Sequence, residues 1–557
     1  MCYPAPVPGK VYDAIIVGTG ACGGFAAKEL TEKGLDVLVL DAGPMPVSGR
    51  DFAQHQWPYE QPFRGLGGPG AGFGRRARSS DQVRLVWGEH PDHPYTTEPG
   101  KPFRWVRSRV VGGRTLHWSR AAHRFSDFDF QAASRDGYGD DWPIRYADLA
   151  PWYDRVERHI GVSAYREGFP QLPDGVFLPG MPYNCAEEMF RGAARRLGLP
   201  VTHRRVAQLS RPHNGRPACH YCGACGQGCD IGAMFNSVAS TLPWAEKTGR
   251  MTLRPNSIVR AVLTREGNRA RGVSYIDRLT RQDYQAEARA VILAASSLES
   301  TRILLNSARG GLGNSSGLLG NYLMDQISGG GVSGFLTRLK GSPSRNDDGK
   351  ASGAFVPNFR NLGQRHPKFI RGYCLSATGG CQEFPQHART TKGYGGGFKK
   401  QVRRGYPAAA RIWLSAGEML ARKENRVEID PTRADAWGIP VLKVVCTHGE
   451  NERALYADAV ETMKEWFTAA GGEIVSAGGG LGVPGGLIHE VGTCRMGANA
   501  KTSVVDPFCR MHDIPNVFVF GGGPFVSSGV HHPTLTMMAL TVRGCDHLAD
   551  QFRRGDV

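Results

Sequence analysis

The chain has 557 residues, a formal net charge of +17 and 13 cysteines. This length exceeds what one hydrophobic core usually organises, so more than one domain is expected. We find no run of 18 apolar residues and no charged-then-apolar leader, which predicts neither a membrane span nor a secretion signal of its own. The odd number of cysteines, without a regular framework, argues against a disulfide-stapled fold.

The positive charge occurs in short stretches such as residues 399–400 and 403–404. No nucleic-acid-binding motif accompanies them, so the charge does not predict nucleic-acid binding. Two interpretations remain, a solvated surface or a docking face for an acidic partner.

The N-terminal segment carries a complete dinucleotide-binding pattern. An apolar strand over 12–17 leads into a glycine-rich turn, then a helix over 25–33 and a second strand over 36–40. An acidic residue, Asp41, ends that second strand. Strand, turn, helix and acidic residue stand in the order that a βαβ nucleotide-binding unit requires.

Each glycine of this turn has a separate physical task. Gly18 allows the tight turn, Gly20 lets the backbone approach a pyrophosphate, and Gly23 lets the helix pack on the strand. The helix N-terminus attracts the phosphate charge, and Asp41 is placed to bind a ribose hydroxyl. The pattern by itself leaves FAD and NAD open.

Four cysteines, Cys219, Cys222, Cys225 and Cys229, lie within eleven residues. The spacing C-x2-C-x2-C-x3-C is typical of thiolates that bind an iron-sulfur cluster, although the usual closing proline is replaced by Asp230. The alternatives are a zinc knuckle, a disulfide pair or free thiols. Zinc sites usually divide their ligands into two separated pairs. We therefore favour iron and electron transfer.

The second half of the chain has a different character. Strand-like runs at 426–430 and 440–446 precede an amphipathic helix over 451–470, which predicts an α+β domain on an antiparallel sheet. The strand over 290–295 and the helix over 298–305 instead indicate a further β-α unit of the nucleotide domain. That domain is then discontinuous.

Three further segments identify a family. Residues 109–118, 489–497, and 516–522 with 532–540, resemble in this order the signature segments of the glucose-methanol-choline oxidoreductases. The resemblance implies FAD rather than NAD, bound in a Rossmann-like α/β domain of the p-hydroxybenzoate-hydroxylase type. The domains expected are 1–328 for the first part of the FAD-binding domain, including the loop 219–229, then 329–480 for the substrate domain and 481–557 for the C-terminal part of the FAD-binding domain.

The same resemblance assigns residues to the cofactor and to catalysis. It implies that His489 and His532 form the catalytic pair, and histidine has a suitable pKa to take the proton of an alcohol. Which of the two takes it stays open. The helix that starts at Pro533 would favour the negative charge of a reduced flavin. Further cofactor contacts are expected at Gly112, Gly113, Thr115, His117, Gly522, Pro533 and Thr534.

His117 precedes a tryptophan at the position where pyranose oxidases of the same family bond covalently to the flavin. The resemblance therefore implies two alternatives for this residue. One is a covalent FAD linkage through His117, and the other is packing beneath the isoalloxazine ring.

Segments 136–143, 214–223 and 307–325 resemble the large subunits of glucoside 3-dehydrogenases. The resemblance implies oxidation of the C3 hydroxyl of a glucoside to the 3-keto sugar, and electron transfer to a cytochrome c or another acidic redox acceptor. It also implies a small subunit with an export signal. The chain would then be made in the cytoplasm and reach the periplasm by co-export.

The subgroup also implies a 3Fe-4S cluster. Its C-x5-C-x3-C spacing maps onto Cys219, Cys225 and Cys229, which leaves Cys222 as a spare, or as the fourth ligand of a 4Fe-4S cluster. Three other functions remain open. They are an oxygen-reducing sugar oxidase of the pyranose-oxidase type, an aldonate or polyol dehydrogenase acting for example on gluconate at C2, and a non-redox FAD protein with zinc at the cysteines.

Overall fold

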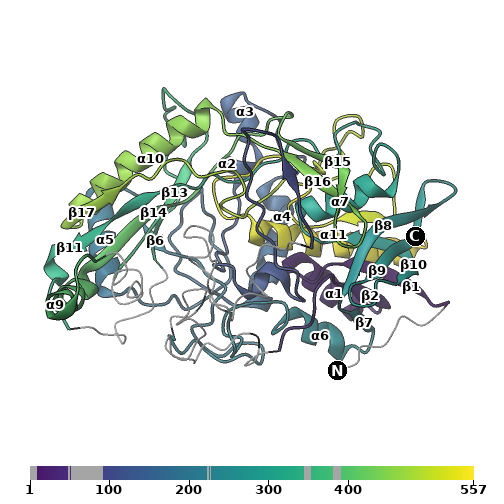
Figure 1. Cartoon of the computed structure of the whole chain (residues 1–557), viewed down its shortest axis with the longest axis horizontal. Helices are drawn as coiled ribbons and strands as arrows, with labels where there is room; N and C mark the ends of the chain where they lie inside the picture. The colour runs from purple at the N-terminus through teal and green to yellow at the C-terminus, as the bar shows by residue number, and fades with distance from the viewer. Residues whose placement is uncertain are drawn as a thin grey trace.

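The computed structural model describes residues 9–47, 51, 92–222, 225, 228–343, 353–379 and 391–557. Two main sheets lie toward opposite ends of the long axis (Figure 1). The sheet on the right of the picture contains both N-terminal and C-terminal strands, whereas the sheet on the left is built mainly from the middle of the chain. None of the helices in the described part of the chain is long and apolar enough to cross a membrane.

The first sheet has parallel strands at its centre. β1 pairs with β2 on one side and with β10 on the other, and β18 pairs with β10. In this register Ile16 lies opposite Val39 and Ile292. These apolar runs are buried because helices cover both faces of such sheets. The strands are β7 (Met251–Arg254), β2 (Val37–Leu40), β1 (Val11–Val17), β10 (Asp283–Leu293), β9 (Arg269–Asp277), β8 (Ser257–Arg265) and β18 (Val517–Val519).

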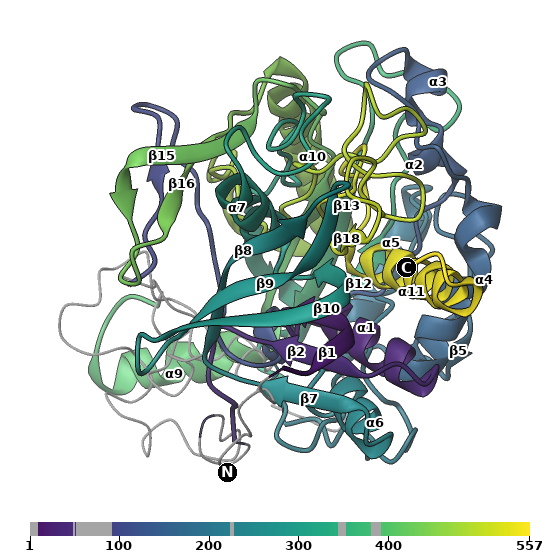
Figure 2. The ribbon, with the colours of Figure 1, turned by 90° about the vertical axis from the view of Figure 1, so that its right-hand side faces the viewer.

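Three helices pack together beside this sheet (Figure 2). α1 (Ala21–Glu32) contacts α11 (Thr534–Arg554), and α11 also contacts α4 (Tyr146–Ile160). α1 begins four residues before the expected start at residue 25, because the glycines after Gly20 are helical. α11 ends at Arg554, where the following residue, Gly555, adopts a left-handed conformation with φ 78°.

The second sheet is antiparallel throughout, in the order β17-β11-β14-β13-β12-β6. The helices α10 (Glu450–Ala469) and α5 (Cys185–Arg196) pack against its strands. The expected fold class, a Rossmann-like α/β unit with an α+β unit on an antiparallel sheet, is confirmed. The strands are β17 (Gly472–Ala477), β11 (Gly331–Leu336), β14 (Ala409–Gly417), β13 (Tyr373–Gly379), β12 (Ala354–Val356) and β6 (Thr202–His203).

Some connections between the two units were not foreseen. Both α5 and β6 precede residue 329, yet β6 is a strand of the second sheet and α5 packs against that sheet. The chain therefore crosses between the two units more often than the expected boundaries imply. The strands expected near 426 and 440 pair with each other, and the second of them also pairs with β3, in a small separate sheet; both contact α7 (Ser297–Ser307). The domain boundaries themselves stay a prediction. The strands of the small sheet are β15 (Arg426–Ala434), β16 (Pro440–Val445) and β3 (Thr96–Thr97).

Shorter elements complete the described chain. They are the helices α2 (Asp127–Phe130), α3 (Ala132–Asp136), α6 (Thr241–Lys247) and α9 (Gly395–Gly405), the 3-10 turns η3 (Gly113–Leu116), η5 (Thr337–Leu339) and η7 (Tyr406–Ala408), and the paired strands β4 (Val162–Ser163) and β5 (Phe177–Leu178).

Candidate active site

The glycine-rich turn after β1 has the geometry of a nucleotide cradle. Gly18 has φ +98°, and a Cβ there would lie 2.6 Å from the carbonyl oxygen of Ala294. A Cβ on Gly23 would lie 1.9 Å from the carbonyl oxygen of Gly18. Leaving aside its two chain neighbours, no heavy atom of the described residues lies within 4 Å of the position of a Cβ on Gly20, the N-cap of α1. The turn is therefore closed toward the protein and open in front of the helix N-terminus, where a pyrophosphate would bind.

Asp41 follows β2 directly, as the nucleotide pattern predicts. One carboxylate oxygen accepts hydrogen bonds from the backbone N–H and the hydroxyl of Thr19, and the other accepts one from the N–H of Gly43 at 2.9 Å. Burial raises the pKa of Asp41 to about 6, against the lowering effect of these hydrogen bonds and of Arg109. A carboxylate has about four acceptor positions, so capacity for a ribose hydroxyl remains.

Hydrogen bonds join the nucleotide turn to the turn η3. The N–H of Gly112 donates to the hydroxyl of Thr19 at 2.8 Å, and the hydroxyl of Thr115 donates to the carbonyl oxygen of Gly112 at 2.5 Å. Ser237 closes the network, because its hydroxyl donates to the carbonyl oxygen of Thr19 and its N–H donates to the Thr115 hydroxyl. The structure thus brings Gly112 and Thr115 to the nucleotide turn, and it adds Ser237, which no sequence motif indicated.

The backbone around η3 is unusual for a helix start. Gly112 and Gly113 have φ values of +92° and +50°, in the region that glycine enters without strain. His117 ends the turn as a buried side chain, with Nε2 2.5 Å from the hydroxyl oxygen of Ser108. The glycines at 112 and 113 therefore shape the turn that presents His117.

The two histidines expected to form the catalytic pair lie together. The ring centroids of His489 and His532 are 5.2 Å apart, although 43 residues separate them. His532 is buried, and Arg204 Nη2 lies 3.3 Å from its Nε2 atom. His489 is only partly buried.

Two more histidines, His123 and His531, lie next to this pair, and the sequence analysis did not include them in the site. The ring of His123 lies 5.0 Å from that of His532 and 5.8 Å from that of His531, and it stacks on Phe355 at 4.5 Å. Neither His123 nor Arg204 falls in a recognisable motif. His531 directly precedes His532, and the family motif assigns the catalytic position to His532 alone.

Burial keeps these histidines neutral. It is the largest cause that lowers the pKa of His489 from 6.5 to about 3, and the cations of Arg114 and Arg204 lower it further. Burial also lowers the pKa of His531 to about 3 and holds those of His123 and His532 well below 6.5. At neutral pH each ring therefore has a nitrogen that can accept a proton.

The C-terminal cofactor residues adjoin this cluster. A Cβ on Gly522 would lie 2.6 Å from the Ser297 hydroxyl oxygen and 2.7 Å from the carbonyl oxygen of Glu490, so only glycine fits there. Pro533 is the N-cap residue of α11, and Thr534 is its first residue. The positive end of α11 therefore begins directly after His532.

Three of the four cysteines in the loop pack against apolar residues, and the fourth is exposed. Cys219, Cys225 and Cys229 belong to one apolar cluster with Ala233 and Met234, whereas Cys222 is exposed. Three N–H groups point at sulfur: Gln208 Nε2 donates to Cys219 Sγ at 2.8 Å, the Tyr221 N–H donates to Cys219 Sγ at 3.4 Å, and the Met234 N–H donates to Cys229 Sγ at 3.5 Å. Among the described residues, which omit 223–224 and 226–227, no three potential ligands converge as they would around a metal ion.

Arg120 connects the cysteine loop to the turn η3. Its buried guanidinium donates to the carbonyl oxygens of Thr115 and Leu116 on one side and to that of Cys225 at 3.1 Å on the other. Arg216, also buried, donates to the carbonyl oxygen of Gly232. Neither arginine pairs with a carboxylate in the part of the chain that the structure describes.

The cysteine loop contributes to the electrostatic environment of Arg120 and Arg216. Burial lowers the pKa of Arg120 and Arg216 to about 10 each, and the described groups that oppose this are Cys225 and Cys229 for Arg120, and Cys229 for Arg216. Burying a cation without an anion is costly. Negative charge at the cysteine loop would remove that cost.

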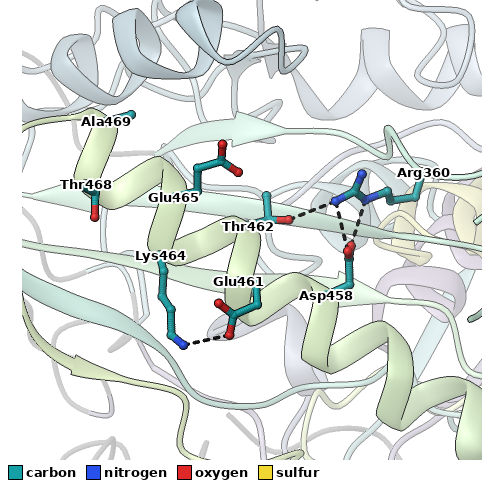
Figure 3. A pocket seen from close by; sticks show the side chains of 8 residues that line it. All are labelled: Arg360, Asp458, Glu461, Thr462, Lys464, Glu465, Thr468 and Ala469. Atoms are coloured by element: carbon teal, nitrogen blue, oxygen red, sulfur yellow. Dashed lines mark hydrogen bonds and ion pairs between the residues drawn. The ribbon is translucent and has the colours of Figure 1, made fainter.

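A separate groove of about 610 Å³ lies along α10 (Figure 3). Arg360 pairs there with Asp458, and Lys464 pairs with Glu461. Because both of its cations already have carboxylate partners and no histidine or cofactor residue lines it, we assign this groove no role. Its lining consists of Arg360, Asp458, Glu461, Thr462, Lys464, Glu465, Thr468 and Ala469.

A dinucleotide cradle beside a cluster of neutral histidines is the arrangement expected of a nucleotide-dependent oxidoreductase. Sequence models of the family described as GMC oxidoreductase match residues 12–328 and 421–541. The chain belongs to this family and is a FAD-dependent oxidoreductase, which confirms the resemblance and the choice of FAD.

Curated relatives extend over almost the whole chain. The fructose dehydrogenase large subunit of Gluconobacter japonicus is 29% identical over 98% of both chains. Paromamine 6'-oxidase of Streptomyces fradiae is 29% identical over 97% of this chain and 92% of its own. The gluconate 2-dehydrogenase flavoprotein of Pantoea cypripedii is 25% identical over 98% and 94%.

Solved structures agree with this fold. Pyridoxine 4-oxidase of Mesorbium loti has a TM-score of 0.62 at 16% identity, over 98% of this chain and 99% of that one. A formate oxidase variant of Aspergillus oryzae has a TM-score of 0.63 at 13% identity, over 99% and 100%. At these identities the likeness concerns the fold alone.

The Gly23→Ala variant should lose its FAD. The new methyl group would overlap the carbonyl oxygen of Gly18, so α1 would have to move away from β1 and open the cradle. The flavin absorbance per protein after purification measures this. Gly192→Ala is the matched control, because Gly192 is also helical and the nearest atom to its Cβ would be Arg196 Nη1 at 3.6 Å. It should keep its FAD and gain about 0.5–1 kcal/mol of stability. Full FAD content in Gly23→Ala would contradict the assignment of this turn as the FAD-binding cradle.

Proposed function

We propose that the protein oxidises a secondary hydroxyl of a sugar or glycoside, at C3 of a glucoside to give the 3-keto sugar, and passes the electrons through an iron-sulfur cluster to an external acceptor. The single observation that carries the electron relay is buried Arg120, which bridges the turn η3 and Cys225 and has no carboxylate partner within the described ranges. The names of the relatives, among them a fructose dehydrogenase and a gluconate dehydrogenase, support the sugar class.

In this proposal His489 takes the proton of the substrate hydroxyl. It is the more exposed member of the pair, whereas His532 Nε2 faces a guanidinium N–H of Arg204, a group that only donates. His532 and Arg204 would then hold and orient the substrate oxygen. Bound FAD supplies the hydride acceptor, at N5, and the turns of Gly18 to Gly23 and of Gly112 to Thr115 would hold it.

In this proposal the cysteine loop would hold a 3Fe-4S cluster rather than a 4Fe-4S cluster. Cys219, Cys225 and Cys229 share one packed cluster and Cys222 stands outside it. N–H donors aimed at sulfur and buried cations are the groups that stabilise an anionic cluster. Such a cluster would supply single-electron transfer from a two-electron donor.

The partners follow from the same proposal. A cytochrome c or another acidic redox protein would accept the electrons, and a small subunit would carry the chain to the periplasm by co-export. The word "large subunit" in the name of one relative supports a second subunit. Covalent attachment of FAD through His117 also belongs to the proposal, and the mass of the acid-denatured protein would test it.

The pH dependence of the reaction should report the lowered pKa of His489. A base works when it is deprotonated, so activity rises with pH through its pKa. Because burial, Arg114 and Arg204 lower that pKa to about 3, we expect kcat/KM to stay level from neutral pH down to about 4. Rates measured directly after a pH jump check this. A fall in kcat/KM toward acid pH with a midpoint near 6.5 would exclude His489, with its lowered pKa, as the base.

An EPR spectrum of the anaerobically purified protein, before and after addition of methyl glucoside, tests the proposed function. A signal of an oxidised 3Fe-4S cluster that disappears with the sugar would support cluster, substrate class and relay together. A protein with zinc or no metal that forms peroxide would favour an oxidase. Absence of flavin bleaching with every alcohol would favour a non-redox role.

Arg204 favours a second candidate substrate, an aldonate. Its guanidinium reaches His532 and has no carboxylate partner among the described residues, and its Nε atom is buried without a hydrogen-bond partner. A substrate carboxylate would supply the ion-pair partner of the Arg204 guanidinium. Gluconate and methyl glucoside compared at equal concentration, as reductants of the bound flavin, decide between the two.

A further inference from the structure

Gln326 lies beside the histidine cluster and belongs to none of the sequence motifs. Its side chain is buried. Its amide nitrogen is within hydrogen-bond distance of three backbone carbonyl oxygens, those of Ser528 at 3.2 Å, Gly529 at 2.7 Å and His531 at 2.7 Å. The amide oxygen lies 2.8 Å from Nδ1 of His489.

The three carbonyl groups determine which way the amide points. A carbonyl oxygen only accepts hydrogen bonds, so the group that faces all three must be the NH₂. The reverse orientation would place the amide oxygen against three other oxygens. The amide oxygen of Gln326 is therefore the atom that faces His489.

This orientation also fixes the proton on His489. An amide oxygen only accepts, so Nδ1 of His489 has to donate and carries the hydrogen. In a neutral imidazole the other nitrogen then has the free lone pair. That nitrogen, Nε2, has no hydrogen-bond partner among the described residues, and it is not among their fully buried polar atoms.

The neighbour of Gln326 holds the backbone of the same histidine. The carboxylate of Asp325 accepts hydrogen bonds from the N–H of His489 at 2.9 Å and from that of Leu487 at 3.0 Å. Between them Ile488 has φ +70°, a costly conformation for a β-branched residue. Asp325 thus stabilises a strained turn, and Gln326 orients the ring that the turn presents.

We propose that Gln326 is a positioning residue that fixes His489 in the Nδ1–H tautomer and thereby makes Nε2 the atom that takes the substrate proton. The last step rests on the proposed function, whereas the tautomer concerns the protein without substrate. The proton would move from the substrate hydroxyl to Nε2, and Nδ1–H would remain bound to the amide oxygen as the ring becomes positively charged.

The tautomer is tested by long-range ¹H–¹⁵N NMR of the holoenzyme with ¹⁵N-labelled histidine and no substrate. We expect a protonated Nδ1 and an unprotonated Nε2 for His489, the signals being assigned by their loss in His489→Gln. In Gln326→Met the two nitrogens should approach averaged shifts, because the acceptor is gone. An unprotonated Nδ1 in the unaltered enzyme would overturn the proposal, whether or not Gln326→Met folds.

Kinetics supply the second readout. Gln326→Met should lower kcat about 10²-fold, the lower range of a general base, with KM changed far less. The matched control is Asn425→Leu, because Asn425 is also a buried amide bonded to backbone, donating to the carbonyl oxygen of Thr447 and accepting from its N–H. The control should lose stability without a change in kcat or in the His489 signals. Equal kcat losses in both variants would overturn a specific role of Gln326.

Gln326→Glu separates orientation from mere packing. Burial and three carbonyl oxygens should keep the new carboxyl protonated, so that it can still donate to a carbonyl and accept from Nδ1. We expect near-normal kcat at low pH and a fall at higher pH, where the original enzyme stays level. A pH-independent loss would overturn the proposal. If no sugar or gluconate reduces the flavin while NMR shows the Nδ1–H tautomer, the proposed function fails and the tautomer assignment stands.

Discussion

His489→Gln should lower the rate of flavin reduction by the substrate about 10³-fold while the protein keeps its FAD. The variant removes the group proposed to take the hydroxyl proton, and general bases typically contribute about 10²–10⁴-fold. Glutamine still fills part of the space and bonds with the neighbouring amide. Anaerobic stopped-flow bleaching of the flavin measures the effect at the chemical step, before any electrons leave.

His532→Asn is the comparison variant. His532 lies 5.2 Å from His489 between ring centroids, but its Nε2 faces Arg204, so its proposed task is to orient the substrate oxygen. Asparagine can still bond to that oxygen, and the loss should be about tenfold, nearer the effect of one hydrogen bond. If His532→Asn were the more damaging of the two, the roles assigned here would have to be exchanged.

Cys225→Ser should abolish turnover with an external acceptor and leave flavin reduction by the sugar intact. In the proposed site serine would replace a thiolate ligand, so the cluster would be lost, and the buried Arg120 beside it would lose its compensating charge. Iron content, EPR and acceptor-linked turnover, each measured beside anaerobic flavin bleaching, separate the relay from the chemistry.

Cys222→Ser is the matched control, because Cys222 is exposed and lies outside the apolar cluster of the other three cysteines. It should keep iron, EPR signal and acceptor turnover. Loss of iron in Cys222→Ser would indicate four ligands and a 4Fe-4S cluster. Unchanged acceptor turnover in Cys225→Ser would exclude the cluster from the electron path.

Features that depend on local spacing were foreseen well. β1 and β2 begin within one residue of the expected strands, because an apolar run next to a glycine turn has few other ways to fold. The glycines at 18 and 23 were recognised because a close approach between backbones tolerates no side chain, and that constraint is visible in the sequence. The order of the family motifs indicated both His489 and His532.

Contacts between distant segments were not foreseen. Gln326 and His489 are 163 residues apart, and Arg120 and Cys225 are 105 residues apart, and no periodicity relates the members of either pair. β6 was not expected in the second sheet, because a strand of two residues carries no pattern of its own and exists only through its pairing with β12.

The sequence by itself determined a dinucleotide cofactor and the two-unit fold, because these follow from glycine spacing and apolar patterns within short segments. The resemblance of its motifs, in their order along the chain, indicated the family and FAD. Only the tertiary structure decided which nitrogen of His489 is available, and that Arg120 stands between the turn η3 and the cysteine loop. Both depend on the direction of hydrogen bonds between side chains and backbone groups that become neighbours only after the chain has folded.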